Sequence, residues 1–253
     1  MGRLCGKVIV VSGGTKGIGR AACEAFAREG AKVAFGGRDV SAANEVCERI
    51  RANGGEAIFV QTDLHHIADC VKLFDGAIQT FGKIDGFFNY AGVIPTCPLD
   101  TCDEETFDKI MDVNGKAAFF CCQQAVRYMR ENGGSIILTG STHDQCGERT
   151  HAAYAFCGGA LQVLCEHISR QYTKEHIRCN YLTVGWTLTE GERALRESKG
   201  CDIEAFKKMA SNSLPFGRMC EIDDYMEPLI YLMSDASAMV TGTDVKITAG
   251  EHI

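Results

Sequence analysis

The sequence predicts an α/β fold in which a doubly wound parallel sheet carries helices on both faces. Seven short apolar runs, rich in β-branched residues, alternate with longer segments of helical period. That alternation is typical of parallel strands joined by crossover helices. Several of the helical segments end in glycine, as helix C-termini commonly do. A chain of 253 residues that is 45% hydrophobic is also long and apolar enough for one sizeable core.

Each expected element corresponds to one of these runs. The expected strands are residues 7–11, 32–35, 57–61, 86–90, 135–139, 179–184 and 244–248. The expected helices are residues 17–30, 40–55, 67–82, 106–134 and 150–176. Because no low-complexity linker or fixed-period repeat interrupts them, we expect residues 1–253 to form a single domain.

The polar, mixed segment at about residues 185–218 departs from this rhythm. It follows the C-terminal end of an expected strand, which is where doubly wound folds bind their ligands. We therefore expect it to form a mobile cover over the substrate.

Charge and hydropathy narrow the classes of function. The chain has 26 Lys and Arg against 33 Asp and Glu, a net charge of -7, and no basic run stands out. Nucleic-acid binding that depends on neutralising phosphates is therefore not expected. No apolar run approaches the ~20 residues that cross a bilayer, and residues 7–11 are too short for a signal-peptide core. We expect a soluble, cytoplasmic protein that acts on a small molecule, with no membrane partner.

The 14 cysteines are scattered through periodic segments. A chain of this size builds its own core and needs no disulfide staples, so we expect reduced, mostly buried thiols. No C-x-x-C pair occurs, and His143 with Cys146 is the nearest approach to a two-ligand spacing. A structural zinc site uses four ligands in closer pairing, so no metal site is expected.

A glycine-rich turn lies between the first expected strand and the first expected helix. Its glycines are Gly13, Gly17 and Gly19. Glycine permits a tight turn and close approach of the backbone, and the helix N-terminus offers free N–H groups and a positive dipole end to a pyrophosphate. The position between strand and helix favours a dinucleotide site of the Rossmann type over a structural turn.

The end of the second expected strand indicates which dinucleotide binds. An acidic side chain there would accept hydrogen bonds from a ribose 2′-hydroxyl, but the sequence has Gly37 at this place. Arg38 beside it suits a 2′-phosphate, and Lys16 adds a second positive charge. We therefore expect NADP(H) rather than NAD(H). The alternative is that both cations are solvated surface residues.

Several motifs occur in the order that is characteristic of one family. They are "SGGTKGIG" at 12–19, "TDL" at 62–64, "NYAG" at 89–92, Asn114 in "DVNGKAAFF", Ser141 after "IILTG", and Tyr154 thirteen residues later. With them the chain resembles the short-chain dehydrogenase/reductase family, and in particular its carbonyl and 3-oxoacyl reductases, over essentially its whole length.

The resemblance implies roles for the matching positions. Asp63 would face the adenine ring, Asn89 to Gly92 would stabilise the sheet beside the cofactor, and Thr189 would contact the nicotinamide carboxamide. Asn114, Ser141 and Tyr154 would form the reaction centre. The full set of implied cofactor-binding residues is Gly13, Thr15, Lys16, Gly17, Ile18, Gly19, Arg38, Asp63, Leu64, Asn89, Ala91, Gly92, Gly185, Thr187 and Thr189.

These catalytic roles make chemical sense. Hydride transfer to a carbonyl carbon builds negative charge on oxygen, so one hydroxyl must stabilise that oxygen and another must donate a proton. Ser141 suits the first task and Tyr154 the second. A phenol with a pKa of ~10 is mostly protonated at neutral pH, which suits reduction, whereas oxidation needs a more acidic phenol.

The chain departs from the family pattern at three positions. Tyr90 replaces the second asparagine of "NNAG", Val184 replaces a proline, and Gly158 replaces the lysine four residues after the tyrosine. One helical turn separates positions 154 and 158, so in the family the lysine reaches under the nicotinamide ribose and lowers the phenol's pKa by its charge. Glycine supplies neither effect.

Few other side chains can take over from the lysine. Lys174 is too far along the helix, and Lys116, two residues past Asn114, points elsewhere. His143 follows Ser141 on a loop that lines the substrate pocket in the family, so it is a candidate acid or base, or part of the pocket wall. His151 precedes Tyr154 by one helical turn and is the weaker candidate.

Three functions remain open from the sequence. The first is an NADP(H)-dependent oxidoreductase of a carbonyl/alcohol pair with an atypical active site. The second is a non-catalytic NADP(H)-binding member with a binding or regulatory role. The third is an enzyme that uses a retained cofactor for transient redox steps. The resemblance also implies a homo-oligomer, a tetramer or a dimer, built on the helices at about 106–131 and 150–176.

Overall fold

The computed structural model describes residues 2–146 and 148–251 and confirms the predicted α/β architecture. One parallel sheet of seven strands has the order β3-β2-β1-β4-β5-β6-β7. Its strands are β1 (Val8–Ser12), β2 (Lys32–Gly37), β3 (Glu56–Gln61), β4 (Gly86–Asn89), β5 (Gly134–Ser141), β6 (Ile177–Val184) and β7 (Asp244–Ile247). Every predicted strand is therefore present. The order reverses direction between β1 and β4, which is the switch point where doubly wound sheets bind nucleotides.

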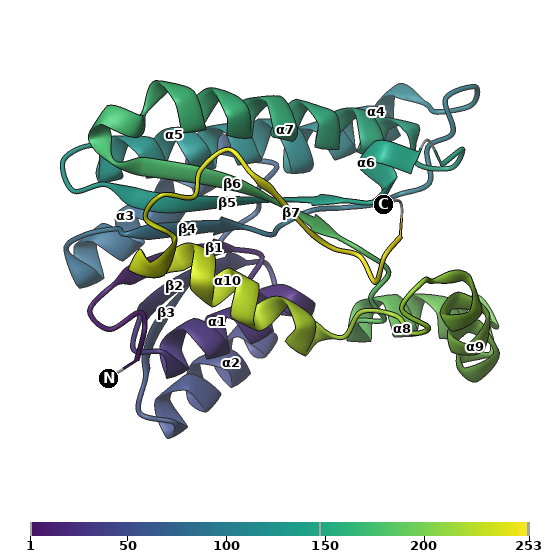
Figure 1. The fold of residues 1–253 in the computed structure, drawn as a ribbon, viewed down its shortest axis with the longest axis horizontal. Helices are drawn as coiled ribbons and strands as arrows, with labels where there is room; N and C mark the ends of the chain where they lie inside the picture. Colours follow the sequence, from purple (N-terminus) through teal and green to yellow (C-terminus); the bar gives the residue numbers. More distant parts are fainter. Residues whose placement is uncertain (1, 147, 252–253) are drawn as a thin grey trace.

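Helices cover both faces of the sheet (Figure 1). On one face lie α1 (Gly17–Arg28), α2 (Val40–Ala52) and α10 (Met226–Met233). On the other lie α3 (Ile67–Phe81), α5 (Ala118–Met129) and α7 (Ala152–Gln171). Shorter helices are α4 (Glu104–Ile110), α6 (His143–Cys146), α8 (Glu190–Ser198) and α9 (Ile203–Ser213), with single 3₁₀ turns at Thr173–Glu175, Ile222–Tyr225 and Asp235–Ser237.

The two cores are built by alternation along the strands. In β1, Ile9 and Val11 face α1 and α2, whereas Val10 faces α3 and α5. The same pattern repeats in β2, where Phe35 and Ala34 lie on opposite faces. Successive side chains of a strand point to opposite faces, so a strand buried on both sides reads as an unbroken apolar run.

The predicted helix at residues 106–134 changes type along its length. Between α4 and α5 the segment Met111–Ala117 is π-helical, and Asn114 lies in it. A π segment inserts an extra residue into the helical turn and often marks a functional site. Hydrophobic period does not distinguish it from an α-helix, so it could not be read from the sequence.

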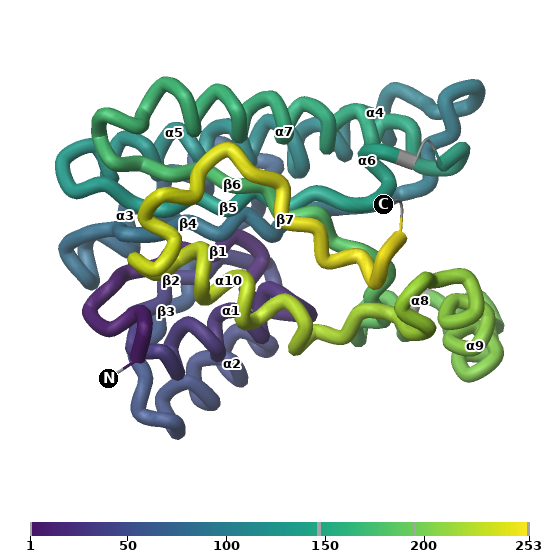
Figure 2. Tube along the Cα trace, in the orientation of Figure 1, coloured from purple at the N-terminus to yellow at the C-terminus, as the bar shows by residue number. Residues whose placement is uncertain are grey.

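The segment expected to cover the substrate contains α8 and α9, which project from the side of the sheet where β6 ends (Figure 1). Its small core joins Phe206 to Trp186, with ring centroids 5.6 Å apart. The backbone N–H of Cys220 donates to the carbonyl of Trp186 at 2.9 Å, so the two ends of the segment are tied together at its base. The C-terminal stretch after α10 contains β7 and continues to the same side of the molecule (Figure 2).

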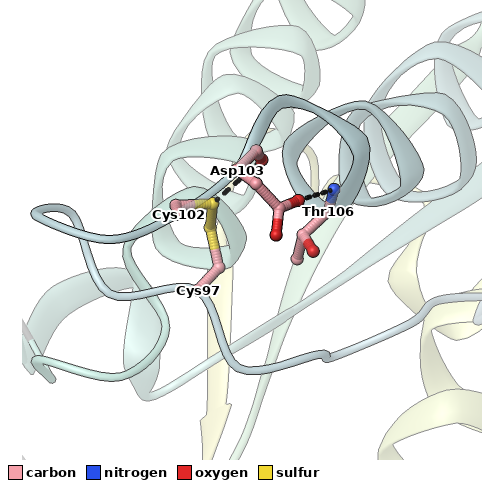
Figure 3. The surroundings of a disulfide bond; sticks show 4 residues. All are labelled: Cys97, Cys102, Asp103 and Thr106. Atoms are coloured by element: carbon pink, nitrogen blue, oxygen red, sulfur yellow. Dashed lines mark hydrogen bonds between the residues drawn. A yellow bond between two sulfur atoms is a disulfide. The ribbon is translucent and has the colours of Figure 1, made fainter.

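The expectation that all cysteines are free thiols is wrong at two positions. A disulfide joins Cys97 and Cys102, whose Cα atoms are 4.6 Å apart, in the loop before α4 (Figure 3). The next residue, Asp103, caps α4 by accepting a hydrogen bond from the backbone N–H of Thr106 at 2.7 Å. The loop folds back on itself and brings the two cysteines within bonding reach, which spacing alone does not reveal.

Within the described part of the chain, no helix has both the length and the apolar content needed to cross a bilayer.

Candidate active site

The glycine-rich turn between β1 and α1 is a close-packed cradle. Gly13 has a φ of +77°, and a β-carbon there would lie 2.8 Å from the backbone of Ala91. A β-carbon at Gly19 would overlap the carbonyl oxygen of Gly13. Helix α1 begins at Gly17, with no side-chain cap and no acidic residue in its first turn. The free N–H groups and the absence of side chains suit a pyrophosphate, so these residues fit the cofactor that the motif predicts. Ile18 is buried in the core, so only its backbone is available to a ligand.

The neighbouring strands support this cradle from below. The hydroxyl of Ser12, at the end of β1, donates to Asn89 Oδ1 at 3.0 Å and accepts from the backbone N–H groups of Tyr90 and Ala91. The ring of Tyr90 packs against Phe88 and lies beside Gly19. Burial raises the pKa of Tyr90 to about 12. Tyr90 therefore fills the space under the glycine-rich turn, and its phenol stays protonated at neutral pH.

The two predicted phosphate-binding cations lie near the end of β2. Gly37 carries no side chain, and a β-carbon there would meet the side chain of Thr15. Lys16 Nζ lies 2.9 Å from a carboxylate oxygen of Asp39, whose other oxygen caps α2. Among the residues that the structure describes, Arg38 forms no ion pair with a carboxylate, and its charge helps to lower the pKa of Asp63. Of the two cations, Arg38 is thus the one not already paired to Asp39.

The predicted adenine-facing residues follow β3. Asp63 Oδ1 lies 2.7 Å from His65 Nδ1 and accepts from the His65 backbone N–H, and these contacts lower the pKa of Asp63. Leu64 is partly buried and packs against the core under α3. Because β1, β2 and β3 are parallel, both residues lie at the carboxyl end of the sheet, as the glycine-rich turn does.

The start of the covering segment contacts the glycine-rich turn. A β-carbon at Gly17 would lie 3.5 Å from the side chain of Thr189, and Arg20 of α1 forms an ion pair with Glu190 at 2.7 Å. Thr189 caps α8. The hydroxyl of Thr187 donates to the carbonyl of Gly185 at 3.0 Å. Thr189 therefore lies against the glycine-rich turn, whereas the Thr187 hydroxyl is bonded to the backbone of Gly185 and to Tyr225.

Asn114 links the π segment to the loop after β4. Its Oδ1 accepts from the backbone N–H of Val93, and its Nδ2 donates to the carbonyl of Val93, both at 2.8 Å. A β-carbon at Gly92 would lie 3.4 Å from Asn114 Oδ1. Because both side-chain groups bond to Val93, Asn114 fixes the position of this loop.

Ser141, Tyr154 and His143 come together at the C-terminal end of β5. The hydroxyl of Ser141 accepts from the backbone N–H of His143 at 3.3 Å, and the Ser141 side chain is near enough to Tyr154 to lower the pKa of its phenol. The rings of His143 and Tyr154 meet edge to face, with centroids 6.2 Å apart. These predicted residues therefore share one small volume, with Tyr154 reaching it from the first turn of α7.

The space beside Gly158 is filled by Asp144. A β-carbon at Gly158 would overlap the Asp144 carboxylate. Asp144 Oδ2 accepts hydrogen bonds from the Ser141 backbone N–H and from the Tyr181 hydroxyl, both at 2.7 Å. Asp144 Oδ1 is buried without a hydrogen-bond partner in the described structure. The glycine thus permits the close approach of an acidic group, where the family pattern has a basic one.

The charge at this centre shifts its titration. Burial raises the pKa of the Tyr154 phenol well above its usual range, and the negative charges of Asp144 and Tyr90 raise it further. The interaction with Ser141 opposes these effects only in part. Burial also raises the pKa of Asp144. A buried carboxylate beside the phenol thus raises its pKa, which is the opposite of what a nearby cation would do.

His143 and His151 are joined through Glu148. The same carboxylate oxygen of Glu148 lies 2.7 Å from Nδ1 of His143 and 2.9 Å from Nδ1 of His151. The two rings are stacked, with centroids 4.9 Å apart. His151 lies just before α7, which begins at Ala152, so it is not on the first helical turn as expected. His143 begins α6 instead of lying on a loop as expected, and Glu148 ties it to the start of α7.

Sequence patterns do not single out Asp144 or Glu148. Each acts through a partner on another element, and a single acidic residue in a polar loop is common. The one available signal was the glycine pair at 158 and 159, because a buried glycine inside a helix often marks close approach of another group. That reason holds for Gly158 and not for Gly159, around which a β-carbon would meet nothing.

Comparisons with known proteins agree with the fold and the motifs. A family model described as enoyl-(acyl carrier protein) reductase matches residues 13–252. The chain is 32% identical to an L-rhamnose 1-dehydrogenase (NAD(P)(+)) of Azotobacter vinelandii, over 98% of this chain and 97% of that protein. It is 32% identical to a 2,5-dichloro-2,5-cyclohexadiene-1,4-diol dehydrogenase of Sphingobium indicum, over 99% and 98% of the two chains.

Solved structures give the same result. A short-chain dehydrogenase/reductase from Serratia marcescens is similar with a TM-score of 0.90 and 28% identity, over 98% of both chains. The match extends through the glycine-rich turn, the sheet and the helix that carries Tyr154. The chain therefore belongs to the short-chain dehydrogenase/reductase family.

Proposed function

We propose that the protein is an NADP(H)-dependent oxidoreductase that reduces the carbonyl group of a small molecule to an alcohol. The observation that carries this proposal is the convergence of Ser141 and Tyr154 beside the cofactor cradle. Two relatives are named as dehydrogenases of a sugar and of a cyclic diol, which supports a carbonyl/alcohol pair.

The side chains divide the work of reduction. When bound, the nicotinamide supplies the hydride. The Ser141 hydroxyl donates a hydrogen bond to the carbonyl oxygen as negative charge develops on it. Tyr154 transfers its phenolic proton to the same oxygen. Burial and Asp144 raise the pKa of Tyr154, so the phenol is protonated and able to donate at neutral pH.

His143 is proposed to form the wall of the pocket beside Tyr154 and, when protonated, to return a proton to it. The edge-to-face contact of the two rings and the link from His143 to Glu148 support this role. Replacing His143 with glutamine tests it, because unchanged turnover would remove the idea.

NADP(H) is favoured over NAD(H) by the end of β2. Gly37 offers no carboxylate to a ribose 2′-hydroxyl, and Arg38 is suited to a 2′-phosphate. Lys16 would have to leave Asp39 to add its charge, since the two form an ion pair at 2.9 Å. The cofactor residues named above would hold the dinucleotide along β1, β2 and the start of α1.

We also propose that residues 1–253 act as one domain, with residues 185–218 as the cover of the site. The outer faces of α5 and α7 are proposed to join copies of the chain into a dimer or tetramer. Phe119, Phe156 and Val163 expose apolar side chains there, and both helices line a hollow of about 320 Å³. Light scattering of the purified protein tests the oligomeric state.

A second candidate function is cofactor binding without turnover, and the Asp144 carboxylate in the lysine's place is the observation that favours it. Titration with NADPH and NADH, followed by nicotinamide fluorescence, and a panel of ketones and aldehydes distinguish the two. Tight NADPH binding with carbonyl-dependent oxidation supports the oxidoreductase. Binding without turnover for the whole panel supports the second function, and equal affinity for the two cofactors contradicts the role of Arg38.

A further inference from the structure

Asp144 has an unusual environment for an acidic side chain. It lies in α6, between the end of β5 and the first turns of α7, with its carboxylate over Gly158. One oxygen receives two hydrogen bonds and the other is buried without a partner. Among the described residues, no lysine or arginine contributes to its electrostatic environment. A buried carboxylate without a cation lowers the stability of the folded protein, so we expect such a group to have a function.

The carboxylate is held in position from three sides. The Ser141 backbone N–H comes from β5 and the Tyr181 hydroxyl from β6, and the space itself is created by Gly158 on α7. The Tyr181 hydroxyl also lies 3.1 Å from the carbonyl oxygen of Gly158, so it anchors Asp144 to α7. The same Ser141 whose backbone binds Asp144 offers its side chain to Tyr154.

From this placement we propose that Asp144 is a positioning residue that keeps the proton on Tyr154, so that the phenol is held in the form that donates during carbonyl reduction. The proposal rests on the proposed function of Tyr154 as proton donor. A phenol that accepts a proton from an alcohol must first be ionised, and ionisation here would place a second negative charge beside a buried carboxylate. The ionised phenol that accepts a proton from an alcohol is therefore formed only at a higher pH, whereas the neutral phenol that donates is present at neutral pH.

Other titratable groups face the same volume. Tyr90 and Cys157 raise the pKa of Tyr154. Tyr181 and Asp244 affect the pKa of Asp144. The His143 ring contacts the Tyr154 ring. Among the described residues, Asp144 is the carboxyl group whose charge chiefly raises the pKa of Tyr154. At the alkaline pH at which a phenol ionises, a carboxyl group has already lost its proton, so its charge is present.

The test uses Asp144→Asn, which keeps the shape and an acceptor for the Ser141 N–H but removes the charge. Titration of Tyr154 is followed by tyrosinate absorbance, as the difference between each protein and its Tyr154→Phe partner, and needs neither cofactor nor turnover. The midpoint should fall by about one pH unit or more in Asp144→Asn. Asp244→Asn is the matched control and should leave the Tyr154 midpoint unchanged.

An unchanged midpoint in Asp144→Asn would overturn the proposal, and Asp144→Ala gives the same comparison if the asparagine variant does not fold. Where the wild type turns over, the pH at which alcohol oxidation reaches half of its maximal rate should fall in Asp144→Asn by the same shift of about one pH unit or more. A shifted midpoint in a protein without turnover would support the role of Asp144 and contradict the proposed function, so the two failures are distinct.

Discussion

The carboxylate of Asp144 occupies the space into which a side chain at Gly158 would extend. The two residues are fourteen positions apart and lie on different helices, α6 and α7. A larger residue at 158 must therefore displace the carboxylate, so the two positions depend on each other.

A lysine at position 158 should destabilise the protein without raising the oxidation rate unless Asp144 is also replaced. Gly158→Lys overlaps the Asp144 carboxylate, and we expect it to lower the free energy of unfolding by about 1–3 kcal/mol, as overpacking does, with no gain in oxidation rate. Asp144→Ala/Gly158→Lys has room for the side chain and should oxidise alcohols at least about tenfold faster than Asp144→Ala, since a cation lowers the phenol's pKa. Thermal unfolding and initial rates measure both effects.

Gly159→Lys is the control for this pair. A β-carbon at Gly159 would meet no other atom within 4 Å, so lysine there should be tolerated. It should also raise helix stability by a few tenths of a kcal/mol relative to glycine. A large gain in oxidation rate from Gly158→Lys alone would contradict the account of Asp144.

Arg38 should set cofactor preference. Arg38→Ala removes the cation beside Gly37, and affinity for NADPH should fall about tenfold or more, because a hydrogen bond to a charged group contributes about 1.5–3 kcal/mol. Affinity for NADH should not change. Arg51→Ala, which alters an exposed arginine at the far end of α2, is the control. Equal losses for both cofactors would show that Arg38 does not read the 2′-phosphate.

The Cys97–Cys102 disulfide should be detectable by thiol counting. Unfolded but unreduced protein should titrate two fewer thiols than its 14 cysteines, and reduction should restore them. Cys102→Ser should lower the free energy of unfolding by roughly 2 kcal/mol from the loss of a short cross-linked loop. Cys5→Ser, at an exposed free thiol, should not. Fourteen reactive thiols before reduction would contradict the bond.

The base of the covering segment should be sensitive to acid. Arg218 donates to Asp224 through both terminal guanidinium nitrogens, at 2.6 and 2.8 Å. This pairing lowers the pKa of Asp224 to about 2. A lowered pKa stabilises the folded protein above the unfolded pKa of ~3.9, and that contribution is lost as pH falls towards 2. As the pH falls from about 5 to about 2.5, Asp224 gains a proton and the ion pair with Arg218 is lost. Limited proteolysis should therefore cleave residues 199–218 faster at the lower pH. Asp224→Asn should show the same loosening already at pH 5, and no difference between the two proteins would contradict the role of this ion pair.

The sheet could be predicted from sequence because its information is local. Each strand is an apolar run of its own, as Val8–Ser12 and Lys32–Gly37 illustrate, and burial on both faces requires such runs. The glycine-rich turn, Ser141 and Tyr154 were likewise readable, since each motif follows a strand end or opens a helix.

The rest depends on contacts between elements. The π segment around Asn114 and the disulfide at Cys97 follow from how loops fold against the sheet. Asp144 reaches Gly158 only because β5, α6 and α7 meet at one corner. The link from His143 through Glu148 to His151 has the same origin. Patterns of period and spacing carry no information on such meetings.

The central claim is that Tyr154 donates the proton in an NADPH-dependent carbonyl reduction. The most direct measurement is carbonyl-dependent oxidation of NADPH by the wild type and by Tyr154→Phe, across a panel of ketones and aldehydes, with NADPH affinity determined for both. We expect the phenylalanine variant to bind NADPH as the wild type does and to lose turnover by roughly 10²–10⁴-fold. Equal turnover by the two proteins, with equal NADPH affinity, would contradict the claim.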